Sequence, residues 1–103
     1  MKRKPLLAGN WKMYTTAPEA QQLAAAVAKA ANKVSGRDVM IAPPYTALAA
    51  VSTILAGSDV ILGAQNVHWE EQGAFTGEIS APMLKDLGCS MAIVDDLGIV
   101  PLN

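Results

Sequence analysis

An amide and a cation stand two residues apart near the start of the chain, directly after an apolar run. The segment from Leu6 to Tyr14 reads LLAGNWKMY, which places Asn10 and Lys12 at the end of that run. If the chain is still extended there, both side chains lie on one face. The positive charge of Lys12 suits a phosphate group or a developing oxyanion, and Asn10 would either position the lysine or donate to the same oxygen. The alternative is an ordinary surface lysine, since lysine is mostly exposed wherever it falls.

Short apolar segments and helical patterns alternate along the chain and would position this pair. Four segments are apolar on both faces and bounded by Pro, Gly, Asn or Asp, as strands of a parallel sheet are. The segments between them carry apolar residues three and four apart, which predicts helices. The first helix opens with Thr16-Ala17-Pro18-Glu19, a capping-box pattern. The expected strands are 6–9, 39–42, 60–63 and 91–94, and the expected helices are 17–34, 46–56 and 80–87.

This order predicts an α/β domain with a parallel sheet and its helices on one side. The 103 residues are enough for one small domain, 1–103, with its own core. Four parallel strands cannot close a barrel, because closed parallel barrels use eight. The bare face of the sheet would then expose Leu, Ile, Val and Met side chains to water. We therefore expect something to cover that face.

Composition excludes several classes of protein. The net charge is −1 and the only basic cluster is Lys2, Arg3 and Lys4, which gives no footprint for nucleic acid or an anionic membrane surface. No apolar span of 18 residues occurs, so neither a membrane span nor a signal peptide is predicted. The single cysteine, Cys89, excludes an internal disulfide and a cysteine-based zinc site, and is expected to be a small buried hydrophobe. A reducing cytoplasm fits this composition.

A long polar connection, AQNVHWEEQGAFTGEI, runs from Ala64 to Ile79. Connections of this length are usually functional or bind a partner, and Trp69 and Phe75 lie on it. The only histidine, His68, is interpreted as part of the loop structure. The alternative is a surrogate base or metal ligand.

Four segments together resemble the first half of the triosephosphate isomerase family of (β/α)8 barrels. They are LAGNWKMY, IAPPYTAL, LGAQNVHWEEQGAFTGEISAPMLKDLGCS and AIV, and the likeness covers residues 5–94. It implies a four-stranded parallel β-α-β-α-β-α-β half of a TIM barrel. It also implies that Asn10 and Lys12 contact the substrate, with Lys12 catalytic. The family reaction interconverts dihydroxyacetone phosphate and glyceraldehyde 3-phosphate in glycolysis and gluconeogenesis. No cofactor and no metal are implied.

The resemblance also implies an oligomer. The long loop would be the one that docks into a second subunit of the family's dimer, with Thr76 reaching toward the partner's active site. Trp69 and Phe75 would anchor this contact, because aromatic residues are enriched at interfaces. The expected partner is therefore the chain itself, as a homodimer or a higher oligomer. Inorganic phosphate or a triose phosphate is expected to bind weakly.

After Val94 the sequence departs from the family. The family continues with Gly-His-Ser-Glu-Arg, whose histidine polarises the substrate carbonyl, whereas this chain reads Asp95-Asp96-Leu97-Gly98-Ile99. An aspartate in the histidine's place would put a negative charge beside a developing oxyanion. The family's glutamate base, its closing lid and its phosphate-binding loops have no counterpart in the 103 residues. Asp95 and Asp96 are interpreted as a solvated turn, the alternative being a carboxylate pair that shares a proton or holds a hard cation.

Three functional hypotheses follow. The first is a truncated triosephosphate isomerase-like protein that is not competent to isomerise alone. The second is a self-associating structural half-barrel without catalysis, in which two copies of four strands would supply the eight that a barrel needs and bury the bare sheet face. The third, ranked last, is an enzyme rebuilt by oligomerisation from Asp95, Asp96 or His68. The tail, 95–103, does not match the family and is expected at most to add an edge strand.

Overall fold

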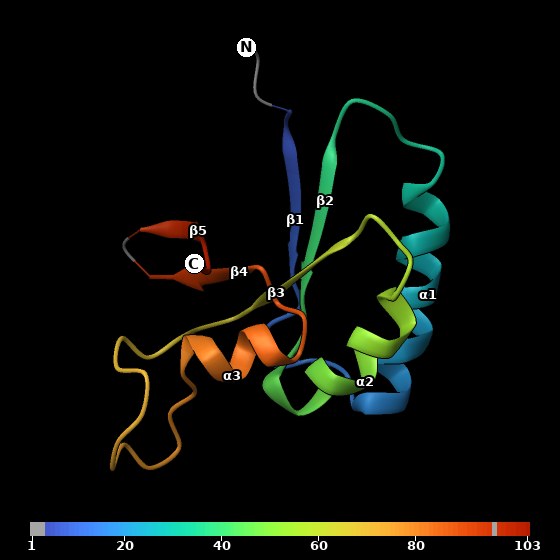
Figure 1. Cartoon of the computed structure of the whole chain (residues 1–103). Helices are drawn as coiled ribbons and strands as arrows, with labels where there is room; N and C mark the ends of the chain where they lie inside the picture. The colour runs from blue at the N-terminus through green and yellow to red at the C-terminus, as the bar shows by residue number, and fades with distance from the viewer. Residues whose placement is uncertain (1–3, 96) are drawn as a thin grey trace.

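A single curled sheet forms the centre of the protein, and three helices lie along its outer side (Figure 1). The computed structural model describes residues 4–95 and 97–103. The strands follow one another in the order β1-β2-β3-β4-β5. They are β1 Leu6–Asn10, β2 Asp38–Ala42, β3 Ile61–Ala64, β4 Met91–Val94 and β5 Gly98–Pro101, and the helices are α1 Ala17–Ala31, α2 Tyr45–Leu55 and α3 Ala81–Asp86.

The first four strands are parallel, and each pairs with the next strand along the chain. Parallel neighbours need a crossover connection, which each of the three helices supplies. The α/β half-barrel expected from the sequence is therefore confirmed. The expected strands and helices all occur, with ends that differ by at most three residues.

The tail adds a fifth strand. β5 runs antiparallel to β4, with Ile93 paired to Ile99 and Val94 paired to Gly98. A tight turn makes this possible, in which the Leu97 N–H donates to the Val94 carbonyl at 2.9 Å and Gly98 takes a positive φ of 75°. The tail thus does add an edge strand, and it occupies the edge of β4 that a parallel fifth strand would need.

The outer face of the sheet and the helices share one core. Register pairs such as Ile41 with Leu62 place alternate strand residues on this face. They pack against the small and branched residues of α1 and α2, which lets these helices approach the sheet closely. The core consists of Ala20, Ala24, Ile41, Ala47, Leu48, Val51, Leu55, Val60, Leu62, Ala64, Leu84, Cys89 and Ala92.

The inner face of the sheet is only partly exposed. Met40, which points to this face together with its register partners Ala8 and Ile61, is fully buried. Its side chain lies over Gly63, where a Cβ would come within 2.4 Å of the Met40 Cε. By contrast, Leu6 and Ile99 at the two ends of this face are each 37% exposed. Within one copy, the expected cover of this face is thus present only at Met40, which fills the space that Gly63 leaves, and the ends of the face stay exposed.

The helix ends explain the shifted boundaries. α1 stops at Ala31 instead of Val34, since Lys33 and Val34 donate to carbonyls three residues back and so form a tighter last turn. At its start, the Thr16 amide and hydroxyl both donate to Glu19 Oε1, at 2.9 and 2.8 Å. These two bonds, the amide first, lower the pKa of Glu19. α3 begins after Ser80, whose hydroxyl accepts from the Met83 N–H at 3.4 Å.

Cys89 is buried in the core, as expected, and burial raises the pKa of its thiol to about 11. In the described part of the chain, no helix combines the length and the apolar character needed to cross a membrane.

Candidate functional site

The pair singled out in the sequence lies at the carboxyl end of β1. Asn10 is the last residue of the strand, and Lys12 follows it in a turn with a positive φ of 56°. The Lys12 N–H donates to Asn10 Oδ1 at 2.9 Å. The condition of an extended chain at Lys12 is thus not met, because the strand ends at Asn10. A contact of this kind is the one expected if Asn10 positions the lysine.

A third residue, which the sequence analysis did not single out, contacts this turn. Gln65 directly follows β3, and its Nε2 donates to the Lys12 carbonyl at 2.8 Å and to the Ala42 carbonyl at 2.9 Å. The Trp11 N–H also donates to Ala42, at 3.1 Å. One side chain therefore connects the carboxyl ends of three neighbouring strands. Gln65 could have been predicted in the same way as Asn10, because it is a polar residue directly after a buried strand.

The turn after β1 contains two residues in the left-handed region. Lys12 has a φ of 56° and Thr15 a φ of 79°, and neither is glycine. A non-glycine residue in this region costs about 1–3 kcal/mol, and such residues persist only where the surroundings hold them. Such conformations cluster at functional sites. The Thr15 hydroxyl is in addition buried without a hydrogen-bond partner among the described residues.

Thr15→Gly is expected to stabilise the protein by about 1 kcal/mol, because glycine adopts a positive φ without steric cost and the unpaired hydroxyl is removed. Urea unfolding measures this change. The matched control is Thr53→Gly in the interior of α2, which should destabilise by about 0.5 kcal/mol, because glycine is a poorer helix former than threonine. An equal loss of stability in Thr15→Gly and Thr53→Gly would contradict the backbone strain at Thr15.

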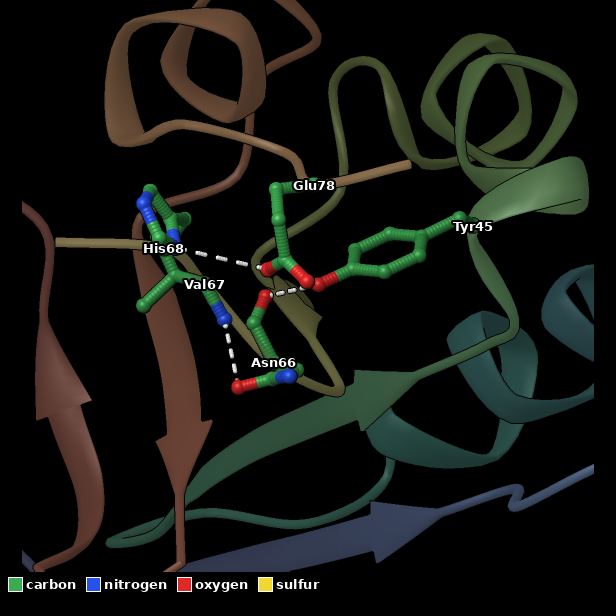
Figure 2. Close-up of polar contacts among 5 residues, drawn as sticks. All are labelled: Tyr45, Asn66, Val67, His68 and Glu78. Carbon is green, nitrogen blue, oxygen red and sulfur yellow. Dashed lines mark hydrogen bonds and ion pairs between the residues drawn. The ribbon is translucent and has the colours of Figure 1, made fainter. Parts of the chain in front are cut away.

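The loop from 65 to 80 projects from the sheet and is closed at its neck (Figure 1). The His68 N–H donates to the Ile79 carbonyl at 2.8 Å, and His68 Nδ1 lies 3.5 Å from Glu78 Oε2. The Tyr45 hydroxyl donates to the Asn66 carbonyl, and Figure 2 shows Glu78 between His68 and Tyr45. Burial, followed by the charge of Glu78, raises the pKa of Tyr45. The two ends of the loop are thereby fixed to each other and to α2.

The three residues expected at an oligomer interface lie beyond this neck. Trp69 is 84% exposed, and Phe75 and Thr76 are also exposed. The rings of Trp69 and Phe75 lie 4.3 and 4.4 Å from the His68 ring. His68 thus contacts Trp69, Phe75 and Glu78 of its own loop, and the contact with Glu78 was not predicted from the sequence.

The described residues of the acidic tail and of the loop include no cluster of metal ligands. Asp95 lies in an exposed turn, which agrees with the solvated interpretation, and Asp96 lies outside the described residues. Across residues 4–95 and 97–103, no group of three His, Cys, Asp or Glu side chains could hold a metal ion. The chemistry available at the end of β1 is therefore that of an ammonium and two carboxamides.

The arrangement matches known proteins over most of the chain. The family model of triosephosphate isomerase matches residues 5–96. The triosephosphate isomerase of Chloroflexus aurantiacus is 51% identical over 92 residues, which are 89% of this chain and 37% of that protein. That of Trichodesmium erythraeum is 52% identical over 93 residues, 89% of this chain and 39% of that protein.

A solved structure gives the same result in three dimensions. The crystal structure of triosephosphate isomerase from Bartonella henselae superposes with a TM-score of 0.77 and 36% sequence identity, over 89% of this chain and 38% of that one. The chain thus spans less than two-fifths of the length of the relatives it matches. With its half-barrel fold and the Asn10–Lys12 turn in place, this chain belongs to the triosephosphate isomerase family.

Proposed function

We propose that this protein is a truncated, triosephosphate isomerase-like half-barrel that keeps an anion-contacting pair, Asn10 and Lys12, and does not isomerise triose phosphates by itself. The observation that supports it is the turn after β1, in which the Lys12 backbone is held by Asn10 on one side and Gln65 on the other. An ammonium so placed at the carboxyl end of a barrel strand lies where this fold has its active sites. It would contact a substrate phosphate or the oxyanion of an enediolate.

The proton-transfer step of the isomerisation is the step for which a catalytic base is lacking among the described residues. A general base must come within hydrogen-bond reach of the proton that it removes. Among the described residues, no carboxylate or imidazole hydrogen-bonds to Asn10, Lys12 or Gln65. His68 pairs with Glu78 at the neck of the loop, and Glu19 caps α1. The strand end where the family has its histidine leads here into Asp95. The chain would therefore bind a triose phosphate through its phosphate group without converting it to an enediolate.

A coupled isomerase assay tests this function. The purified 103-residue chain is expected to give no turnover of glyceraldehyde 3-phosphate above that of a Lys12→Ala variant. The family reaction depends on a base that no described residue supplies at the strand end. Turnover by the wild-type chain that the Lys12→Ala substitution abolishes would contradict the proposal, since it would show a catalytically active site that depends on Lys12.

Self-association is a second candidate function, and the exposed apolar residues support it. Leu6 and Ile99 at the ends of the inner face, together with Trp69 and Phe75 on the loop, present apolar surface to water. Each Å² that a second copy buries contributes about 25 cal/mol. The resemblance to a family whose loop docks into a second subunit supports the same partner. With β5 on the edge of β4, however, two copies would not close eight parallel strands into a barrel.

Trp69→Ser tests the contribution of the loop. If the loop makes the contact, this substitution should weaken the association constant on the order of tenfold or more, because truncated aromatic anchors cost about 2 kcal/mol and upwards. Sedimentation velocity over a concentration series measures it. The matched control is Tyr14→Ser, which removes an exposed aromatic from another loop. Identical behaviour of both variants and the wild type would exclude the loop as the contact.

A further inference from the structure

We propose that Gln65 is a positioning residue that holds Lys12 in its left-handed conformation and so sets the direction from which the lysine meets its anion. The inference rests on the proposed anion contact of Lys12 for its functional meaning, and on the hydrogen bonds of Gln65 for its structural content. The Gln65 side chain donates to two backbone carbonyls, so it acts through Lys12.

The chemistry of the side chain fits this task. A primary amide carries two N–H donors on one nitrogen, and Gln65 has one acceptor for each of them, the carbonyls of Lys12 and Ala42. The Ala42 carbonyl belongs to the last residue of β2 and is fixed by the sheet. The amide therefore connects the turn after β1 to the end of β2. Neither a carboxylate, which only accepts, nor an apolar side chain can replace it.

The conformation of Lys12 needs such support. Its φ of 56° is unfavourable for a residue with a Cβ. Its peptide groups are held from both sides, since the N–H donates to Asn10 Oδ1 at 2.9 Å and the carbonyl accepts from Gln65 at 2.8 Å. The backbone conformation fixes the direction of the Cα–Cβ bond. Release of the carbonyl would let the turn relax toward a negative φ and redirect the lysine side chain.

The first measurement uses the wild-type chain without ligand. Both side-chain amide hydrogens of Gln65 are expected to exchange with solvent more slowly than those of Gln72, an exposed glutamine in the loop. Exchange as fast as that of Gln72 would show that the two hydrogen bonds do not persist in solution, and would overturn the proposal before any variant is made.

The second measurement compares variants by NMR. Gln65→Glu is isosteric and at neutral pH cannot donate, and Gln65→Leu removes all polar atoms. Both should move the one-bond Cα–Hα coupling of Lys12, which distinguishes positive from negative φ, toward the value for negative φ. Gln21→Leu is the matched control, because the Gln21 amide also donates to a backbone carbonyl, that of Ala50 at 3.1 Å, but between α1 and α2. An unchanged Lys12 coupling in folded Gln65→Glu would contradict the proposal.

Titration with inorganic phosphate gives the functional readout. Loss of the two hydrogen bonds predicts that Gln65→Leu weakens phosphate binding on the order of tenfold. Gln65→Glu should weaken it further, since it also adds a negative charge, and Gln21→Leu should leave it unchanged. If phosphate does not bind the wild type at all, the anion contact of the proposed function fails, and the exchange rates and the Lys12 coupling still decide the positioning role. Unchanged phosphate affinity in both Gln65 variants would overturn the functional part.

Discussion

Lys12→Ala is expected to abolish measurable binding of inorganic phosphate. The two side chains that hold this turn, Asn10 and Gln65, are neutral, so the substitution removes the only charge of the three residues. A hydrogen bond to a charged group contributes about 1.5–3 kcal/mol, which corresponds to a loss of roughly ten- to a hundredfold in affinity. Because phosphate binding to the wild-type chain is expected to be weak, this loss of affinity should place binding to the variant below the detection limit of the titration. NMR titration at low ionic strength is the measurement, since salt screens an exposed charge.

Two further variants make the result specific. Lys29→Ala removes an exposed lysine from the last turn of α1 and should leave phosphate binding unchanged. Lys12→Arg keeps the charge but changes the donor geometry, so partial binding is expected. If Lys12→Ala and Lys29→Ala lower the affinity equally, phosphate would be responding to net charge and not to the turn after β1.

Leu48→Ala is expected to destabilise the protein by about 2–5 kcal/mol, the usual range for a buried leucine in a core. Leu48 is 1% exposed and packs in α2 against the outer face of the sheet. Domains of this size have about 5–15 kcal/mol of stability in total, so a large share would be lost. Urea unfolding followed by circular dichroism measures the change in the free energy of unfolding.

Leu23→Ala in α1 is the matched control for Leu48→Ala. Leu23 is exposed, so its truncation leaves no cavity and should cost well under half as much. A similar loss in both variants would mean that a second copy buries Leu23 in solution. A negligible loss for Leu48→Ala would contradict the packing of α2 on the sheet.

The fold could be predicted from the sequence to the extent that it depends on local patterns. The apolar runs predict the strands of the parallel sheet, because these strands are buried on both faces. The three- and four-residue spacings predict the helices, because each helix buries one stripe of its surface. β5 was harder to predict, since Gly98–Pro101 is a short run with a proline and becomes a strand only through its pairing with β4. The burial of Met40 likewise depends on the absence of a side chain at Gly63, a contact between two strands.

The candidate site could be predicted in part for the same reason. Asn10 and Lys12 follow an apolar run and are visible as a polar end to it. The positive φ of Lys12 and the contact from Gln65 could not be read there, because they arise from residues 53 positions apart in the chain. The neck of the loop is similar, since Tyr45 and Asn66 meet across 21 positions. Side chains that act on backbone groups of distant segments carry no periodic signal.

The mass of the wild-type chain in solution tests most directly the claim that an open half-barrel covers its exposed sheet ends and loop with a second copy. Sedimentation equilibrium at several concentrations gives this mass. We expect dimers or larger assemblies that dissociate on dilution, with the exposed residues Leu6, Ile99 and Trp69 protected in the assembled state. A compact monomer of 10.8 kDa at every concentration would contradict it.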